Sequence, residues 1–402
     1  MTEQPTGPLA GLVVFDLTRV LAGPTCVQML GDLGADVIKI EKPGTGDDTR
    51  GFAPPVMPGT QDSAYFVGAN RNKRSVTLDI ATAEGQAIAH RLIAQSDIMV
   101  ENFKVGALAR YGLGYEQLHA LHPGLIYCSI TGFGQTGPYA PRPGYDSLVQ
   151  AMGGIMSLTG EPDGLPQKVG VPVADLFAGL YGCIGVLAAL RHRAATGQGQ
   201  QVDVGLLDSH IAWLANQGMN YLATREDPPR LGNQHPNIVP YQVFATADGA
   251  MVLSVGNDPT FQRFARAVGL AHVLDDARFA TNAARVANRQ HVTETLAPVM
   301  ASDTTANWIS RLEAISVGCG PINTLAQVFA DPQVVARQNV VRVPHATAPD
   351  GVEVIANPVR LSETPVDYRR GPPQLGQHTD EVLGGLGLSA KELAGLRERG
   401  VI

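Results

Sequence analysis

A single carboxylate stands at the start of a long apolar segment. Asp175 follows KVGVPVA and precedes LFAGLYG, and no histidine partner or metal-ligand set lies near it in the sequence. A lone carboxylate in such a setting suggests a nucleophile rather than half of a general acid–base pair. The dipole of a helix starting at Asp175 would favour negative charge, so we expect a low pKa and an ionised side chain. Aspartate is also a favoured N-cap, which leaves a purely structural role open.

A glycine-rich segment, TGFGQTGPYAPRPGYD, precedes Asp175 in the chain. Its residues 132–137 match GxGxxG, but a dinucleotide fingerprint requires a helix that opens at the last glycine. The prolines of the following PYAPRPG oppose such a helix, so we do not predict an NAD site. The glycines are expected either to let the backbone approach a bulky ligand or to form a turn.

Several cations follow predicted strands. Lys42 comes after DVIKIE, and Lys104 and Arg110 come after DIMVEN. Loops at the carboxyl ends of parallel strands line the ligand crevice of an open α/β sheet, where cations can hold phosphates. A solvated helix face explains the same residues equally well. Lys73 and Arg74 precede a strand, so we expect them at the opposite edge of the sheet.

Composition and charge narrow the function classes. The chain of 402 residues is 44% hydrophobic, which is enough to build a large core. Its net charge is −7 and it contains no run of basic residues, so we do not expect a nucleic-acid partner. The apolar run from Leu176 to Leu190 is too short to span a bilayer and is predicted as a core helix. Isolated cysteines and the lack of a signal-like N-terminus favour a reduced, cytoplasmic location. His119 and His122 lack a third ligand, so no metal site is predicted.

The first half of the chain alternates short apolar runs with helical segments. This alternation predicts an α/β fold with a parallel, doubly wound sheet. The first helix is expected from Pro24 to about Leu33. Further helices are expected over 82–95, from Asp175 to about Arg193, and over 206–223. The predicted strands are 12–17, 36–41, 75–80, 97–102, 125–130 and QVDVGL.

The spacing of apolar residues changes after a polar, proline-containing linker, TREDPPRLGNQHPNIVP. Asp248-Gly249 separates two apolar runs and predicts a hairpin. Amphipathic helices near 259–269, 288–301 and 303–314 complete a smaller α+β domain. A second hairpin is expected around Pro349-Asp350-Gly351, and two short helices in the tail.

Ordered sequence blocks then resemble a known family over essentially the whole chain. They include NRNKRSVTLDI, VENFKVGALARYGLGYEQL, GFGQTGPYAPRPGYD, the Asp175 segment, GNQHPNIVPYQVF, GPINTLAQVFADPQV and LGQHTDEVL. The chain resembles class III CoA-transferases, the formyl-CoA and carnitine CoA-transferase family. The IVPYQVF and GPINTLAQVFADPQV segments look most similar to the succinyl-CoA:dicarboxylate, glutarate-type members.

The resemblance implies a fold that periodicity does not show. It implies a large Rossmann-like, CoA-binding domain made from both chain ends, residues 1–224 and 326–402. Residues 225–325 would form the linker and the small α+β domain. Two chains would be threaded through each other as an interlocked homodimer.

The resemblance also implies roles for residues. Asp175 matches the nucleophile, and Tyr145 and Asp146 match positions beside the reacting thioester. Formyl-CoA transferases carry a mobile run of glycines after the linker, and this chain instead has Gly232-Asn233-Gln234-His235 near that place, which argues against formate and oxalate as substrates. Arg19, Gln234 and His235 are candidates for binding the substrate carboxylate or an oxyanion. The positions that match CoA contacts are Val20, Leu21, Ala22, Lys42, Leu78, Asn102, Phe103, Lys104 and Arg110.

The activity implied is CoA transfer from an acyl-CoA donor, such as succinyl-CoA, to a carboxylic and specifically a dicarboxylic acid. The CoA thioesters are substrates, and no permanently bound cofactor is expected. The alternative is a 2-methylacyl-CoA racemase of the same fold. Racemases use a histidine base in a Gly-His-Asp triplet, where this chain has Gly144-Tyr145-Asp146. Tyrosine, with a pKa of about 10, is a poor base at neutral pH.

Overall fold

The structure of the protein is a computed structural model that describes residues 6–402. The chain divides into two compact units. The large unit comprises the described residues up to Gly154, together with Val169–Leu214 and Gln333–Ile402. The small unit comprises Ile155–Lys168 and Ala215–Pro332. The sequence placed a middle domain at 225–325; the small unit observed here also includes 155–168, 215–224 and 326–332.

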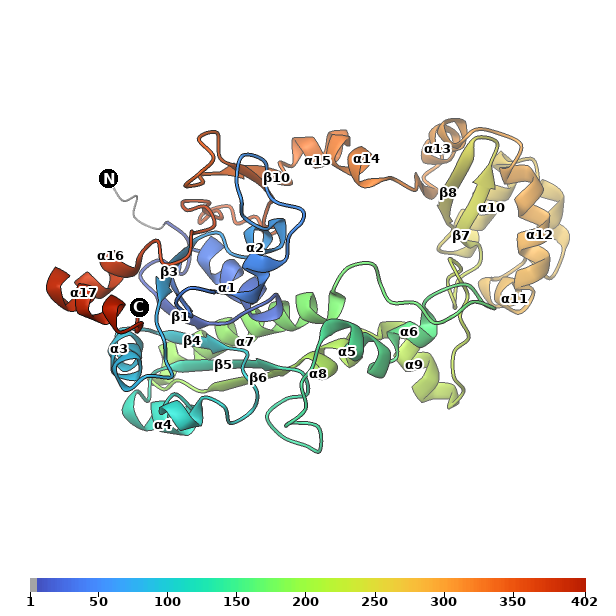
Figure 1. Cartoon of the computed structure of the whole chain (residues 1–402). Helices are drawn as coiled ribbons and strands as arrows, with labels where there is room; N and C mark the ends of the chain where they lie inside the picture. Colours follow the sequence, from blue (N-terminus) through green and yellow to red (C-terminus); the bar gives the residue numbers. More distant parts are fainter. Residues whose placement is uncertain (1–5) are drawn as a thin grey trace. The chain divides into compact units, whose positions relative to one another are not determined.

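A six-stranded sheet forms the centre of the large unit (Figure 1). All of its strands are parallel, in the order β3-β2-β1-β4-β5-β6, which confirms the predicted α/β fold. The strand order reverses between β1 and β4, and ligands of open α/β sheets bind beside the carboxyl ends of strands at such a point. The strands are β1 (Val13–Leu17), β2 (Asp36–Glu41), β3 (Lys73–Thr77), β4 (Ile98–Glu101), β5 (Ile126–Thr131) and β6 (Gln201–Gly205).

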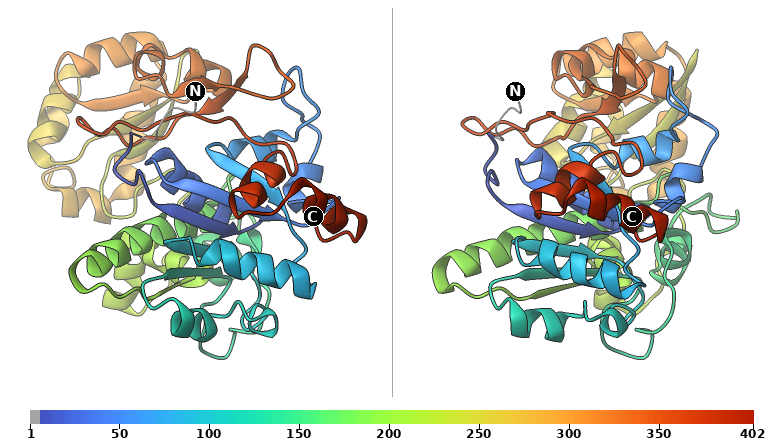
Figure 2. Two further views of the ribbon diagram at one scale, coloured as in Figure 1. Left: turned by 90° about the vertical axis from the view of Figure 1, so that its left-hand side faces the viewer. Right: turned by 60° about the vertical axis from the view of Figure 1, so that its left-hand side comes forward.

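Helices cover both faces of this sheet, and each face has its own apolar core. Figure 2 shows α16 and α17, in red, beside the sheet whose face they share with α3 and α4. Strands covered on both faces require near-continuous apolar runs, which is why their sequences lack alternation. One face carries α1 (Ala22–Asp32) and α7 (Val173–Thr196); the other carries α3 (Ala83–Ile93), α4 (Tyr115–Leu121), α16 (Thr379–Gly385) and α17 (Ala390–Glu398).

Helix α7 starts earlier and ends later than the sequence predicts. It begins at Val173, so Asp175 lies in its first turn, and it ends where Gly197 adopts a φ of 76°. By length and composition alone, α7 is apolar enough to cross a membrane. Its buried residues pack against α1, β5 and β6, whereas Leu180, Tyr181 and Ile184 of the same helix are exposed.

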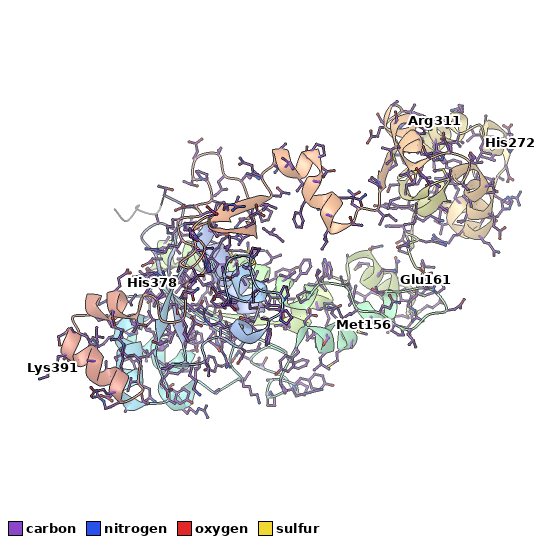
Figure 3. All side chains as sticks on the ribbon, turned by 45° about the horizontal axis from the view of Figure 1, so that its top comes forward. Met156, Glu161, His272, Arg311, His378 and Lys391 are labelled. Carbon is purple, nitrogen blue, oxygen red and sulfur yellow. The ribbon has the colours of Figure 1, made fainter. Side chains whose placement is uncertain are left out.

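The large unit contains further short segments, of which α5 and α8 pack against α7. The main-chain N–H of Ser75 donates to Nδ1 of His378 at 3.2 Å, which ties the C-terminal segment to β3 (Figure 3). The second predicted hairpin is confirmed as the antiparallel pair β10 and β11. These segments are α2 (Ala64–Gly68), α5 (Asp146–Met152), α8 (Leu206–Ala212), β10 (Val340–Val343), β11 (Val352–Ile355) and the 3₁₀ turns Asp48–Gly51 and Ala109–Tyr111; α15 (Pro332–Ala336) begins at the unit boundary.

The predicted helix over 206–223 is wrong as one element. The chain forms α8 and then α9 (Ala215–Thr224), and Ala215, the first residue of α9, has a φ of 47°. A non-glycine residue in the left-handed region interrupts the helical hydrogen-bond ladder, a break that apolar periodicity does not reveal.

The small unit is an α+β structure built on an antiparallel sheet in the order β7-β8-β9 (Figure 1). The hairpin predicted at Asp248-Gly249 is confirmed, because β7 ends at Thr246 and β8 begins at Gly249. Its core includes Trp308 and Phe261. Its elements are α6 (Ile155–Leu158), α9, β7 (Tyr241–Thr246), β8 (Gly249–Ser254), α10 (Asp258–Ala267), the 3₁₀ turn Ala271–Asp275, α11 (Asn282–Ala287), α12 (Arg289–Met300), α13 (Thr305–Glu313), β9 (Gly318–Pro321) and α14 (Leu325–Ala330).

The close approach of α7 to α1 depends on Gly179. A Cβ at this position would lie 2.7 Å from the carbonyl oxygen of Ala22 and 3.0 Å from Cβ of Thr25. We expect Gly179→Ala to lower the free energy of unfolding by about 1–3 kcal/mol, because the methyl group must push the two helices apart. Urea unfolding followed by circular dichroism measures this change.

Gly384→Ala is the matched control for this replacement. Gly384 is also helical, and a Cβ there meets nothing within 4 Å. Its replacement should leave stability unchanged or raise it by up to about 1 kcal/mol through helix propensity. Equal effects of the two replacements would contradict the tight α1–α7 contact.

Candidate active site

Two loops meet at the carboxyl ends of β1 and β4, where the strand order reverses. The main-chain N–H of Arg19 donates to Oδ1 of Asn102 at 2.9 Å, and Nδ2 of Asn102 donates to the carbonyl of Arg19 at 2.7 Å. The Arg19 guanidinium also lies over the Phe103 ring, 5.0 Å from its centre. The structure therefore brings together the predicted segments that contain Arg19–Ala22 and Asn102–Lys104.

Asp175 lies on the side of α7 that faces the start of α1. Residues four apart share one helix face, so Asp175 stacks on Gly179, which contacts Ala22. Asp175 is half-buried and comes from an element distant in sequence from the two loops. The packing of α7 on α1 thus places the carboxylate beside the Val20–Ala22 segment.

Asp146 caps α7, and Asp175 does not. Oδ1 of Asp146 accepts the main-chain N–H of Ala174 at 2.9 Å, and its Oδ2 accepts Nε2 of Gln150 at 2.7 Å. Across residues 6–402, neither oxygen of Asp175 accepts a hydrogen bond from the protein. The capping interpretation of Asp175 is therefore wrong, and both of its oxygens are available to a ligand.

The expectation of a low pKa for Asp175 is also wrong. Burial, the largest cause, and the nearby negative charge of Asp146 together raise the pKa of Asp175 to about 7. Desolvation of a carboxylate disfavours its charged form, and here it outweighs the helix dipole. The ionised form of Asp175 is consequently high in energy near neutral pH, which suits a group that gains by forming a covalent bond.

Tyr65, at the start of α2, is a residue that the sequence analysis missed. Burial raises the pKa of the Tyr65 phenol, and the charges of Asp175 and Asp146 raise it further, which places the ring near both carboxylates. Its side chain is 38% exposed. No pattern in DSAYFVG singles it out, because its role comes from tertiary contact alone.

The other predicted residues of the large unit differ in their surroundings. Lys42, Lys104 and Arg110 are exposed, and within the described chain none of them forms an ion pair with an acidic residue. Tyr145 is 68% exposed, whereas Leu78 is 2% exposed and packs in the core shared with α3. Exposed, unpaired cations are suited to binding an anion; a CoA contact at Leu78 stays a prediction.

Gln234 and His235 belong to the small unit, and Asp175 belongs to the large one. The His235 ring stacks on Tyr241 with centres 5.1 Å apart, and Oε1 of Gln234 accepts Nη1 of Arg289 at 3.4 Å. Burial lowers the pKa of His235, and the charge of Arg289 lowers it further. A substrate role for either residue stays a prediction.

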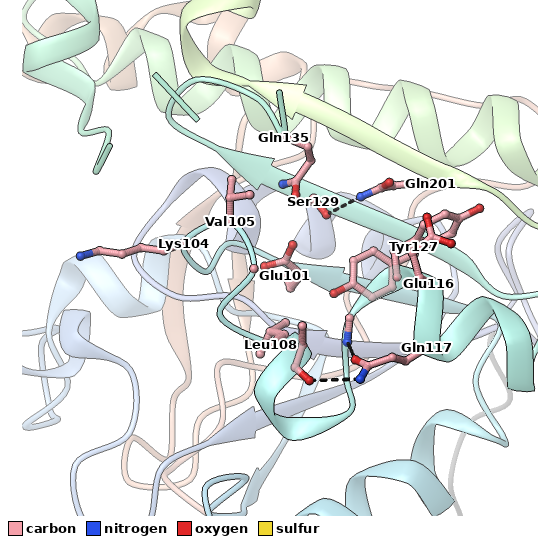
Figure 4. A pocket seen from close by; sticks show the side chains of 14 residues that line it. Glu101, Lys104, Val105, Leu108, Glu116, Gln117, Tyr127, Ser129, Gln135 and Gln201 are labelled. Carbon is pink, nitrogen blue, oxygen red and sulfur yellow. Dashed lines mark hydrogen bonds between the residues drawn. The ribbon is translucent and has the colours of Figure 1, made fainter. Parts of the chain in front are cut away.

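A cavity of about 310 Å³ lies behind the Asn102–Lys104 loop (Figure 4). Glu101 lines it, and its Oε2 accepts the main-chain N–H of Phe103 at 2.8 Å. Burial raises the pKa of Glu101 to about 7, against the lowering effect of hydrogen bonds from Ser129 and Phe103. Sequence analysis passed over Glu101 because it reads as the last residue of a buried strand.

Residues 6–402 contain no group of three or more His, Cys, Asp or Glu side chains that could hold a metal ion.

Comparison with known proteins gives a consistent result. The profile of CoA-transferase family III matches residues 9–379. The chain is 48% identical over 391 residues to a succinate–glutarate CoA-transferase of Agrobacterium fabrum, covering 95% of this chain and 97% of that protein. It is 42% identical over 376 residues to the succinyl-CoA:glutarate CoA-transferase of Homo sapiens, covering 94% and 85%. A crystal structure of a CAIB/BAIF family protein from Brucella suis, 48% identical, superposes with a TM-score of 0.83 and covers 95% of this chain and all of that one.

The raised pKa of Asp175 predicts how stability changes with pH. The unfolded carboxyl has a pKa of about 3.9, so between pH 4 and 7 the folded state holds its proton more tightly. Wild-type stability therefore loses a contribution as pH rises through this window. Asp175→Asn removes the loss, so its free energy of unfolding should exceed wild type by roughly 1–3 kcal/mol above pH 7, allowing for solvent near a half-buried group.

Urea unfolding of both proteins from pH 4 to 8 measures this difference. Asp350→Asn, at the exposed tip of the β10–β11 hairpin, controls for the loss of one carboxylate. A constant difference between Asp175→Asn and wild type across the whole range would show that Asp175 titrates as an ordinary surface carboxyl.

Proposed function

Because the chain belongs to CoA-transferase family III, we propose that it transfers CoA from succinyl-CoA, or a similar acyl-CoA, to a dicarboxylic acid. The observation that carries this proposal is the state of Asp175. It lies in the first turn of α7, and Asp146 rather than Asp175 accepts the N–H of Ala174. A desolvated carboxylate with both oxygens free is suited to nucleophilic attack on a thioester.

The reaction proceeds through acyl transfers on Asp175. The carboxylate attacks the donor carbonyl, the C–S bond breaks, and a mixed anhydride and CoA thiolate form. The thiolate attacks the aspartyl carbonyl of the anhydride, which releases the donor acid and leaves an aspartyl-CoA thioester. The acceptor carboxylate then repeats these steps in reverse order, so Asp175 is regenerated. Water must be kept from the two reactive intermediates, and burial of the site serves this purpose.

Other residues bind the substrate in this scheme. Lys42, Lys104 and Arg110 are exposed cations without an acidic partner in the described chain, and we assign them to the phosphates of CoA. Tyr65 lies near Asp175 and Asp146 in space, and Tyr145 directly precedes Asp146 in the sequence. We assign both tyrosines to the acyl end of the substrate.

The second carboxylate of a dicarboxylic acid needs its own partner. Arg19 is a cation of the first of the two loops, and its Nη1 lies 3.7 Å from Oδ2 of the exposed Asp48, a pair that a substrate carboxylate can displace. Gln234 and His235 remain further candidates from the small unit.

The proposal includes an interlocked homodimer and a cytoplasmic location. Large apolar side chains of the large unit are exposed on α7 and α8, at Leu180, Tyr181, Ile184 and Ile211. Such side chains support a partner surface, since single chains rarely leave clustered apolar residues in water. The free cysteines Cys26, Cys128, Cys183 and Cys319 are in keeping with a reducing compartment.

Replacement of Asp175 tests the nucleophile. Asp175→Ala and Asp175→Asn should each lower the rate of CoA transfer at least about 10³-fold while CoA binding persists, because the covalent step is lost. Asp175→Glu should also be poor, since the extra methylene misplaces the attacking oxygen. Steady-state kinetics with succinyl-CoA measures these rates.

A trapping experiment locates the intermediate independently. After incubation with acyl-CoA and then hydroxylamine, mass spectrometry should find the modification on the peptide that contains Asp175. Asp163→Ala, an exposed carboxylate, is the control and should be labelled and active like wild type. A label on another peptide, or full activity of Asp175→Ala, would contradict the role of Asp175 as the nucleophile.

A panel of acceptor acids tests the substrate class. With succinyl-CoA as donor, glutarate and other dicarboxylic acids of similar length should exceed monocarboxylic acids of equal length in kcat/KM by at least about tenfold, because a monoacid lacks the second carboxylate that is assigned to pair with Arg19. Formate and oxalate should be poor acceptors.

A parallel incubation of a chiral 2-methylacyl-CoA in deuterated water covers racemisation. Exchange of the α-proton without an acceptor acid would favour the racemase. Equal rates with mono- and dicarboxylic acids would refute the dicarboxylate assignment while leaving CoA transfer itself in place.

A further inference from the structure

A fully buried ion pair lies beneath the loop that follows β1. Nζ of Lys39 is 2.9 Å from Oδ2 of Asp47, and both side chains are 0% exposed. Lys39 also donates to the carbonyl of Thr18 at 2.8 Å, and Oδ1 of Asp47 accepts the main-chain N–H of Val20 at 3.2 Å. The pair therefore hydrogen-bonds to the backbone on both sides of Arg19, at the carbonyl of Thr18 and the N–H of Val20.

The backbone held by this pair is strained. Val20 has a φ of 70°, in the left-handed region that β-branched residues rarely adopt because Cβ crowds the carbonyl. Such outliers persist only where surrounding contacts determine them, and they concentrate at ligand sites. Val20 lies after β1, at the point where the strand order reverses, and is separated from α1 only by the N-cap residue Leu21.

Asp47 is itself held rigidly in place. Its Oδ1 accepts the main-chain N–H of Thr49 at 3.0 Å and the Thr49 hydroxyl at 2.8 Å. Its own N–H donates to Oε2 of Glu41 at 2.9 Å. The contact with Val20 is thus part of a network that extends from β2, and Asp47 cannot follow the loop if Val20 relaxes.

Buried ion pairs seldom stabilise a fold relative to apolar side chains of similar volume. Burial opposes the charge on Lys39, but the charges of Asp16, Asp47 and Glu41 together hold the pKa of Lys39 above its ordinary value. The charge of Lys39 in turn lowers the pKa of Asp47 against the effect of burial, so the pair is charged at neutral pH. The advantage of the Lys39–Asp47 pair over an apolar pair must therefore be the backbone conformation that it imposes. An apolar pair would fill the same space but could not hydrogen-bond to Thr18 and Val20.

We propose that Lys39 and Asp47 are positioning residues that keep Val20 in its left-handed conformation and so present the Val20–Ala22 backbone to the acyl-CoA substrate. The proposal rests on the CoA-transferase function, because it takes CoA as the ligand of this loop. Neither side chain touches substrate, since both are fully buried.

Replacement of Asp47 separates positioning from chemistry. Asp47→Ala should raise the dissociation constant of CoA, measured by calorimetry, and the KM for succinyl-CoA about tenfold, with kcat changed less than about threefold. Asp47→Asn keeps an oxygen that accepts the N–H of Val20, so it should stay within about threefold of wild type in all three quantities.

Glycine at position 20 supplies the decisive comparison. Glycine adopts a φ near 70° without a steric penalty, so in a Val20→Gly background the loss caused by Asp47→Ala should shrink to less than about threefold. If Asp47→Ala does not fold, the double variant Lys39→Met/Asp47→Leu, which leaves no unpaired buried charge, takes its place with the same expected tenfold rise.

The pair Arg71–Asp32 is the matched control. It is also buried, with 2.6 Å between Nη2 and Oδ2, and within residues 6–402 neither side chain hydrogen-bonds to the Thr18–Ala22 loop. Asp32→Ala should lower the melting temperature without changing the dissociation constant of CoA. A folded Asp47→Ala with wild-type affinity for CoA, or an equal change in Asp32→Ala, overturns the positioning role. A wild-type protein that binds CoA but transfers it to no acid overturns the proposed function instead.

Discussion

The hydrogen bond from the N–H of Ala174 to Asp146 decides what Asp175 is free to do. A buried helix N-terminus needs acceptors for its first N–H groups, and an aspartate in the first turn would ordinarily supply one. Because Asp146 from α5 fills that role, Asp175 keeps both oxygens unbonded within the described chain. The same arrangement places a second negative charge beside Asp175, which adds to the desolvation that raises its pKa. Structural support and electrostatic activation of Asp175 therefore come from one neighbour.

Charge is buried around this end of the sheet to an extent that stability does not require. Lys39, Asp47 and Lys73 are each 0% exposed, and Nζ of Lys73 lies 3.3 Å from Oδ2 of Asp16. These groups hold the turn after β1 and the carbonyl of Pro24 at the start of α1. The strand interiors by contrast are apolar. Polar groups concentrate where the backbone must leave regular structure, because only hydrogen bonds can fix an irregular loop in one conformation.

Sequence reasoning found the elements whose signal is local. The run DVIKIE became β2 with the predicted bounds, and Asp248-Gly249 made the predicted hairpin, since turn residues and apolar runs need no distant partner. It placed Lys73 and Arg74 before a strand, whereas they are the first residues of β3 and Lys73 is buried in an ion pair. Sequence gave no indication of Tyr65 or of the cap by Asp146. Both depend on α2, α5 and α7 meeting in space, and pairings between distant segments leave no periodic trace in the chain.

The position of Asp175 in the chain predicted its importance but not its local properties. The lone carboxylate before an apolar run and the family resemblance both pointed to Asp175, but two properties inferred from its position, an N-cap and a low pKa, were wrong. The helix begins at Val173, so Asp175 is a residue of the first turn and not the N-cap that the sequence analysis considered. The dipole argument failed because burial of the carboxylate weighs more than half a unit charge at a helix end. A nucleophile that is costly to ionise gains most from acylation, since the ester-like product carries no charge to desolvate. The burial that opposes ionisation of Asp175 therefore also favours its acylated form.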